Sequence, residues 1–347
     1  MTSSLDIYEE WAEKTRMSAE FGVSLHYYDL AGVTICIRLH DKSLESPFLR
    51  AITHLKVEEG QAKYVIDVWD CKRNNLSFPK FNYGVDDVKL RGEIPNYSGS
   101  GISFAYFSHA RMVHILNENK HHGIVALVDA RQLPVFELAC PFRAIFSWIL
   151  RNNSRAMIHG AALADNNGDG YLILGKSGAG KSTSAISCFI SGMKYIGDDL
   201  CAIGMLDNEI YVFSLYSSGK TYYSECEFLP LLSKYASSLK DKYFPKEIYF
   251  FGEEHQRICH SARIKKILIP SKNKECYSND SFSVAALMSM TITSTQELLP
   301  NAGFELLPLL SKAFKQAEIS VMPLHEDRRC PLITQHPKIQ NKSWEKV

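Results

Sequence analysis

The sequence of 347 residues predicts an α/β domain in its second half, preceded by a smaller, mainly β domain. Two observations carry this prediction. Apolar and β-branched runs fill the first part of the chain, whereas strand-like and helix-like segments alternate after about residue 155. A glycine-rich loop, Gly175–Ser182, also stands between an apolar strand and a helix. We therefore expect an N-terminal β-rich domain at residues 1–135, an α/β domain at 136–327 and a polar, basic tail at 328–347.

The first domain owes its predicted strands to runs of β-branched and aromatic residues. Such runs lie at 32–39, 63–69, 101–108, 123–128 and 133–138. The last two flank Asp129–Gln132 and are typical of a hairpin. His121 and His122 fall in a polar stretch, which indicates a solvated loop rather than a metal site.

The second domain begins with a helix predicted at 141–152, because Pro141 suits a first helical turn and apolar residues recur on one face. Beyond it, strands are predicted at 155–163, 171–174, 193–196, 200–205, 209–215, 263–269 and 319–323. Helices are predicted at 181–191, 228–239, 283–299 and 302–317.

Charge and composition exclude several classes of function. A formal net charge of +1 gives no general attraction to nucleic acid or to an anionic membrane. Residues 1–16 lack the order of a signal peptide, and no apolar run reaches the roughly 18 residues of a membrane helix. The nine cysteines form no C-x-x-C pair, which argues against zinc ribbons and thiol redox sites. We expect a cytoplasmic protein with reduced thiols and without nucleic-acid or membrane partners.

The glycine-rich loop satisfies the pattern G-x-x-x-x-G-K-[ST]. Its glycines let the backbone curve around a phosphate with N–H groups pointing inward, and Lys181 opens a helix whose positive end faces the anion. The Lys181 ammonium would reach the β and γ oxygens, and the Ser182 hydroxyl would bind Mg²⁺. No guanine-binding Asn/Thr-Lys-x-Asp motif occurs, so the expected ligand is Mg²⁺-ATP. The residues expected to bind it are Gly175, Lys176, Ser177, Gly178, Ala179, Gly180, Lys181, Ser182 and Thr183.

Two adjacent carboxylates, Asp198 and Asp199, follow the next strand. Ligands of open α/β sheets bind at that edge, so the pair is expected to face the loop. One carboxylate can bind Mg²⁺ while the other accepts the proton of an attacking hydroxyl. The alternative is a solvated turn, because Gly-Asp is common turn chemistry. His159 lies in a strand expected to pair near Tyr171–Leu174; it either positions an aspartate or is purely structural.

The ordered set His159-Gly160, Gly175–Ser182 and Gly197-Asp198-Asp199 resembles that of the bacterial HPr kinase/phosphorylase family and the wider HPr-kinase-like proteins. The similar stretch runs from about Arg155 to Met205 and extends weakly to Ile319. The resemblance implies a P-loop kinase domain with an HPr-kinase/carboxykinase-like mixed sheet behind a separate N-terminal domain. It also implies an ATP-dependent serine kinase.

The resemblance assigns roles to the residues of the motifs. Asp198 would be the general base that activates a serine hydroxyl, His159 would contact it, and Lys181 would complete the catalytic set. Asp199 and Ser182 would bind the metal.

The family also uses two residues further along the chain. One is a metal-binding glutamate, for which Glu225 is the best-placed candidate and Glu227 the second. The other is an arginine that steadies the phosphate, a role open to Arg257 or Arg263.

Two positions depart from the HPr kinases themselves. Thr183 stands where they have an acidic residue, and Gly197 where they have alanine. In length and in the Gly-Asp-Asp form, the chain is more similar to the divergent branch that phosphorylates a serine of ribosomal precursor peptides, as in lasso-peptide pathways. The implied partner is therefore a peptide or protein with an acceptor serine. The hexameric HPr kinases also imply a homo-oligomer.

Two other functions are compatible with the loop. A nucleotide-gated regulator would bind without transfer, although it would have no use for a base at Asp198. A small-molecule kinase or a carboxykinase-like enzyme would share a similar nucleotide core, although the chain is short for a whole carboxykinase.

Overall fold

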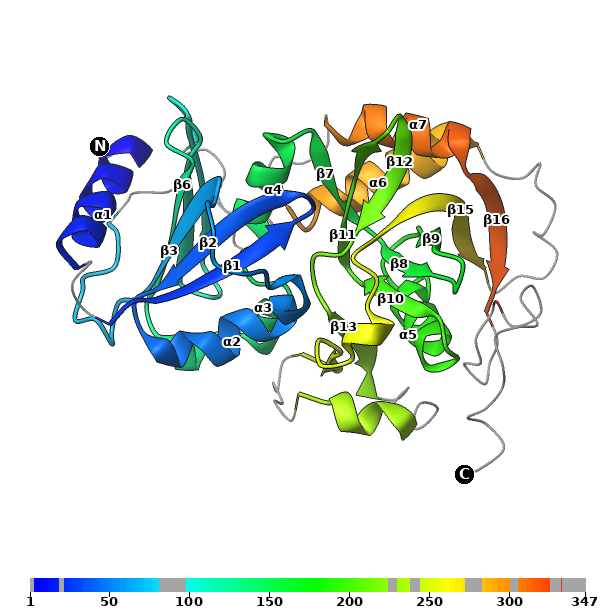
Figure 1. The fold of residues 1–347 in the computed structure, drawn as a ribbon, viewed down its shortest axis with the longest axis horizontal. Helices are drawn as coiled ribbons and strands as arrows, with labels where there is room; N and C mark the ends of the chain where they lie inside the picture. The colour runs from blue at the N-terminus through cyan, green and yellow to red at the C-terminus, as the bar shows by residue number, and fades with distance from the viewer. Residues whose placement is uncertain are drawn as a thin grey trace. The chain divides into compact units, whose positions relative to one another are not determined.

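The computed structural model describes residues 3–18, 22–80, 98–223, 230–237, 244–271, 283–299, 305–324 and 332. The fold is mixed α/β with several sheets (Figure 1). The chain divides into two compact units, Met1–Asn153 with Gln296–Asn301, and Ser154–Thr295 with Ala302–Val347. The boundary expected at 135 therefore falls inside the first unit, which retains the two helices that follow it.

The first unit is built on a six-stranded sheet of order β1-β2-β3-β6-β5-β4. Its strands are β1 (Ser24–Leu30), β2 (Val33–Leu39), β3 (Tyr64–Asp70), β4 (Ile102–Phe107), β5 (Met112–Asn117) and β6 (His122–Leu127). Its helices are α1 (Ser4–Ser18), α2 (Glu45–Leu49), α3 (Val135–Ala139) and α4 (Arg143–Arg151), with 3-10 segments η1 (Lys42–Leu44), η2 (Arg50–Leu55) and η5 (Ala130–Gln132). Helix α1 packs on the sheet, where Tyr8 and Trp11 join the apolar cluster of Trp69 and Phe104.

The hairpin predicted across Asp129–Gln132 is wrong. The segment after it forms helix α3, with Pro134 at the N-cap. Both edges of β6 are already paired, to β3 and to β5, so no edge remains for a further strand. Pro134 also lacks the N–H that a ladder needs and suits the start of a helix.

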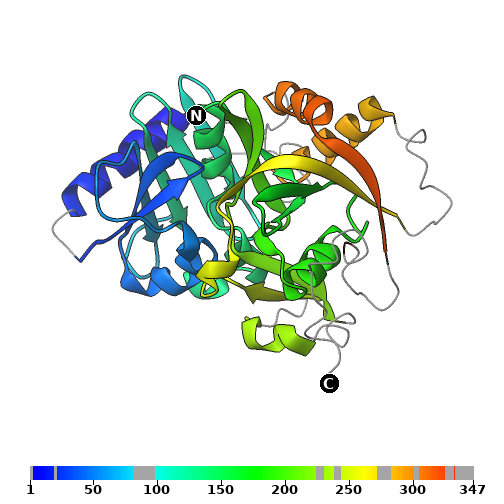
Figure 2. The ribbon, with the colours of Figure 1, turned by 45° about the vertical axis from the view of Figure 1, so that its right-hand side comes forward.

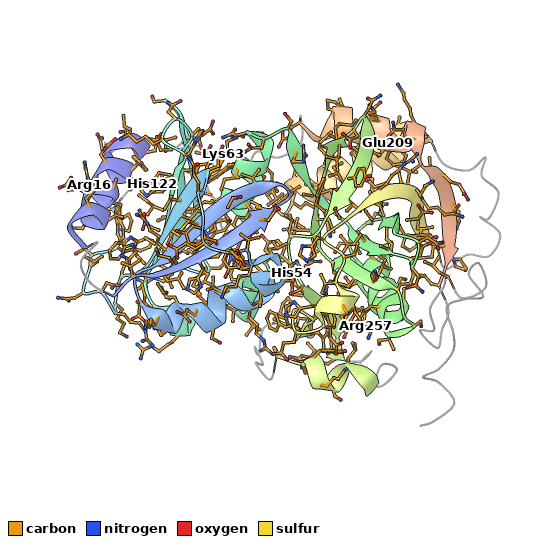
Figure 3. All side chains as sticks on the ribbon, viewed as in Figure 1. Arg16, His54, Lys63, His122, Glu209 and Arg257 are labelled. Carbon is orange, nitrogen blue, oxygen red and sulfur yellow. The ribbon has the colours of Figure 1, made fainter. Side chains whose placement is uncertain are left out.

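His122 does not lie in a solvated loop (Figure 3). It begins β6, and its Nε2–H donates to Asp67 Oδ2 (2.6 Å) while its Nδ1 accepts from the Tyr8 hydroxyl (2.8 Å). Asp67 is fully buried and also accepts from His40 Nε2 (2.7 Å) and from Arg38 Nε (2.8 Å). These residues form a charge-compensated cluster inside the first unit, the Asp67 cluster.

The second unit is built on an eight-stranded sheet of order β10-β8-β9-β15-β12-β11-β7, with β16 alongside β15. Its strands are β7 (Arg155–His159), β8 (Ala161–Ala164), β9 (Asp169–Ile173), β10 (Lys194–Gly197), β11 (Leu200–Leu206), β12 (Glu209–Phe213), β15 (Ser261–Ser271) and β16 (Glu318–Pro323). Strands β13 (Ser218–Tyr222) and β14 (Lys246–Phe250) form a separate two-stranded sheet, and η7 (Pro230–Tyr235) and η8 (His255–Arg257) are 3-10 segments.

Helices cover both faces of the larger sheet (Figure 2). Helix α5 (Lys181–Ile190) packs on one face through a cluster that includes Ile186 and Phe189. Helices α6 (Val284–Gln296) and α7 (Leu306–Gln316) pack on the other, where Leu287 and Leu310 join the core. Within the described residues, no helix is long and apolar enough to cross a membrane.

Candidate functional site

The glycine-rich loop leaves β9 and enters α5. Gly178 and Gly180 have φ of 77° and 94°, a region that side chains disfavour. A Cβ on Gly180 would also lie 2.9 Å from Leu324 Cδ1. Lys181 then begins α5, and the N–H groups of a first helical turn have no acceptor within their own helix. The loop can thus offer backbone donors and the positive end of a helix to an anion.

The Lys181 side chain is buried within the loop. Its Nζ donates to the Gly175 carbonyl (2.8 Å) and to the Lys176 carbonyl (3.1 Å). Carbonyl oxygens are neutral acceptors, and an ammonium forms stronger hydrogen bonds with a phosphate. A bound phosphate can therefore compete for this ammonium.

Strands β9 and β10 bring the loop and the aspartate pair to one edge of the sheet. Strand β8 lies between them and is antiparallel to both, so β9 and β10 are parallel. Ala161 pairs with Ile173 at the end of β9, and on the other side the Gly160 N–H donates to the Asp199 carbonyl (3.2 Å). Two strand spacings, about 10 Å, separate the start of the loop from the aspartates.

Asp198 is a buried carboxylate with an open oxygen. The residue is 2% exposed, and its Oδ1 is buried without a hydrogen-bond partner among the described residues. The backbone N–H of Lys220 lies 3.4 Å from Oδ2. Burial, followed by repulsion from Asp199, raises the pKa of Asp198 to about 6. A carboxylate with this pKa can accept a proton near neutral pH.

Asp199 lies in a tight three-residue turn. Its φ is 63°, and the Leu200 N–H donates across it to the Asp198 carbonyl (2.8 Å). The Asp199 carboxylate forms an ion pair with Lys220 Nζ. Burial alone would raise the pKa of Asp199, but the attraction of Lys220 outweighs it and holds this pKa well below its ordinary range. The two neighbouring aspartates therefore differ: one is firmly ionised and one is poised to take a proton.

His159 is buried at the end of β7. Its backbone N–H donates to Thr295 Oγ1 (3.0 Å), and its Nδ1 lies 3.2 Å from the Ser294 carbonyl. A carbonyl only accepts, so Nδ1 carries the proton and Nε2 is unprotonated in the neutral ring. Burial and then Lys181 lower the pKa of His159 to about 4. The expected contact with Asp198 is not among the hydrogen bonds of the described residues; the aspartate whose charge acts on His159 is Asp199.

The remaining predicted residues divide into those near the loop and those elsewhere. Ser182 and Thr183 lie half-buried in the first turn of α5. Glu225 and Glu227 lie outside the described residues.

Neither candidate arginine reaches the loop. Arg257 donates to the Phe189 carbonyl near the end of α5 and lies 4.0 Å from the Phe189 ring. Arg263 pairs with Glu209 (3.1 Å) and lies in register with Asp169, at the end of β9 that is remote from the loop.

Sequence reasoning missed Lys220. Its strand, β13, is short, and the small polar residues before it give no alternating apolar pattern. Only the long-range contact with Asp199 reveals the lysine as part of the site.

The oxygen donors suit a hard divalent cation. Among the described residues there is no group of three or more His, Cys, Asp or Glu side chains that could hold a metal on its own. Mg²⁺ is commonly bound by one or two carboxylates together with substrate phosphates and water. The Asp199 carboxylate and the Ser182 hydroxyl fit this requirement.

No protein-family model matches the sequence, and no curated protein matches it. Among solved structures, the chain is similar to that of the Hpr(Ser) kinase/phosphatase from Coxiella burnetii, with a TM-score of 0.26 and 13% sequence identity. The similarity covers 37% of this chain and 72% of that one. A TM-score this low supports no inference about function.

Proposed function

We propose that the second unit is an ATP-dependent phosphotransferase that phosphorylates a serine hydroxyl of a peptide or protein. The observation that carries the proposal is Asp198: a buried carboxylate with an unpartnered oxygen, at the sheet edge where the glycine-rich loop begins. Burial of an open carboxylate oxygen is costly for folding alone. A site that must accept a proton from a bound hydroxyl has a use for it.

In the proposed reaction, Asp198 takes the proton of the serine hydroxyl as its oxygen attacks the γ-phosphorus. The bond from that phosphorus to the β,γ-bridging oxygen breaks, and ADP leaves in line with the attacking oxygen. Lys181 and the first-turn amides of α5 hold the phosphates. Ser182 and Asp199 would hold Mg²⁺, which would supply positive charge beside the phosphates.

The acceptor class follows from the resemblance in the sequence. We propose a peptide or protein serine, with a ribosomal precursor peptide of the lasso type as the first substrate to test. A cytoplasmic location would supply ATP and would keep the free cysteines, such as Cys188 and Cys201, reduced. A homo-oligomer is proposed on the same resemblance, and light scattering on the purified protein would measure it.

Asp198→Asn tests the reaction. We expect the rate of transfer to candidate serine peptides with Mg²⁺-ATP, measured by mass spectrometry, to fall by about a hundredfold to ten-thousandfold because the substituted amide cannot accept the proton. The affinity for ATP should change by less than about threefold, since Asp198 does not belong to the loop. Asp169→Asn, at the opposite end of β9, is the matched control and should leave both quantities unchanged.

Two outcomes contradict the proposal. If Asp198→Asn transferred phosphate at the wild-type rate, Asp198 would not be the general base. Tight ATP binding without transfer to any peptide or small-molecule hydroxyl would favour a nucleotide-gated regulator, whereas phosphorylation of small molecules alone would move the acceptor to that class.

A further inference from the structure

Lys220 places a buried ammonium beside the aspartate pair. The residue is 8% exposed, its Nζ pairs with Asp199, and its backbone N–H approaches Asp198 Oδ2 (3.4 Å). Both contacts come from β13, which lies outside the large sheet. A third segment of the chain thus contributes to the site.

The packing of β13 fixes Lys220 in place. The Tyr195 hydroxyl donates to the Ser218 carbonyl (2.6 Å). A Cβ on the intervening Gly219 would lie 3.0 Å from the Phe251 ring and 3.2 Å from Ile186 Cδ1 of α5. The backbone therefore approaches α5 closely, and a side chain at this position would press on Phe251 and Ile186. The lysine next to it is thus carried by a tightly packed segment.

Asp199 has two uses that compete. A buried ammonium requires an anionic partner, which Asp199 supplies. In the proposed reaction the same carboxylate binds Mg²⁺, and a divalent cation draws its charge away from the lysine. The buried ammonium of Lys220 beside Asp199 then attracts further negative charge, and the phosphates are the anions that arrive with the metal.

We infer that Lys220 exchanges partners: it holds Asp199 while the site is empty and binds the γ-phosphate of the nucleotide once the metal has engaged Asp199. This inference rests on the proposed function. It also gives a phosphate-binding cation to a site in which Arg257 and Arg263 are engaged elsewhere.

The first experiment measures equilibrium binding of Mg²⁺-ATP and Mg²⁺-ADP to Lys220→Met by calorimetry. ATP should bind about tenfold to a hundredfold more weakly, the range for a lost hydrogen bond to a charged group, and ADP should change by less than about threefold. Lys220→Arg should recover most of the ATP affinity. Lys194→Met, at the far end of β10, is the control and should bind both nucleotides like the wild type.

The second experiment removes the metal. Here the inference predicts an increase in ATP affinity, the opposite of the decrease expected for Lys220→Met. In EDTA, Asp199→Asn should bind ATP more tightly than the wild type, because Lys220 is released from its ion pair. The double variant Asp199→Asn/Lys220→Met should lose this gain. If mere repulsion between Asp199 and phosphate were the cause, the gain would persist in the double variant and the exchange of partners would be refuted.

The outcomes separate the two proposals. Wild-type protein that fails to bind ATP would overturn both. ATP bound equally well by the wild type and by a folded Lys220→Met would overturn the role of Lys220 alone. Retained ADP binding and an unchanged thermal transition show that the variant is folded. If it does not fold, Asp199→Asn in EDTA still tests the exchange, because ATP affinity no higher than that of the wild type would overturn it.

Discussion

At the scale of single residues, the site depends on the different environments of two neighbouring carboxylates. Asp199 has a cation beside it, whereas Asp198 has burial and a like charge. Asp199 therefore stays ionised, whereas Asp198 can take up a proton near neutral pH. This difference would let Asp199 bind a metal and let Asp198 accept a proton in the proposed reaction.

The pKa of Asp198 can be tested directly. In nucleotide-free protein labelled at the aspartate carboxyl carbons, one signal should titrate near pH 6, and it should vanish in Asp198→Asn. The folded state holds this proton more tightly than the unfolded chain does, so the group lowers stability as pH rises from about 4 to about 6. Asp198→Asn should remove that decrease from thermal unfolding curves. A signal that titrates near pH 4 would contradict the raised pKa.

At the scale of elements, the sequence predicted what depends on local pattern. The strand and helix around the loop were confirmed as β9 and α5, as were the hairpin of β11 and β12 and the final strand β16. Strand β13 and Lys220 could not be predicted, because the strand is polar and gives no local signal. Among the residues that the structure describes, its ladder partner is β14. Helix α3 was missed because its residues have the composition of a strand. Both edges of β6 are already paired, so the segment cannot add a strand beside it and forms a helix instead.

Gly180 gives a prediction at this scale. Gly180→Ala should weaken ATP binding at least tenfold and cost about 1–3 kcal/mol of unfolding free energy, because its φ of 94° and its contact with Leu324 both oppose a side chain. Gly168→Ala is a matched control: φ there is 85°, but nothing lies within 4 Å of the added carbon. Gly168→Ala should lower the free energy of unfolding by a similar amount, because its backbone is strained in the same way, and should leave ATP affinity unchanged. Equal losses of ATP affinity in both variants would contradict the assignment.

At the scale of the whole molecule, the two units carry different chemistry. All described residues of the proposed transfer site belong to the second unit, whereas the first unit buries the Asp67 cluster. Arg38, His40 and His122 donate hydrogen bonds that satisfy the buried carboxylate, and the Arg38 charge compensates it, so the cluster is self-sufficient and its role is to stabilise the sheet.

Asp67→Asn should therefore destabilise the first unit by about 3 kcal/mol, because the substitution leaves buried donors without their anion. Faster hydrogen exchange of the β2 and β3 amides would measure the loss. ATP affinity should stay within about twofold of the wild type. Glu10→Gln, which removes an exposed pair with Lys14 on α1, is the control and should cost less than about 1 kcal/mol. Unchanged exchange in Asp67→Asn would show that the cluster is not a source of stability.

The backbone at Gly160 and Ala161, where β7 ends and β8 begins, limits how this site can change. Because this one backbone pairs with the end of β9 on one side and with Asp199 on the other, the span from phosphate loop to base is fixed by hydrogen-bond lengths. A Cβ on Gly160 would lie 3.1 Å from the Ile173 carbonyl, so the spacing leaves little room for a side chain. Substitutions of the surrounding side chains can therefore change which acceptor binds between the glycine-rich loop and Asp198, while the distance between the loop and Asp198 stays the same. Selection for a new acceptor would act on the surrounding segments and leave the backbone at Gly160 unchanged.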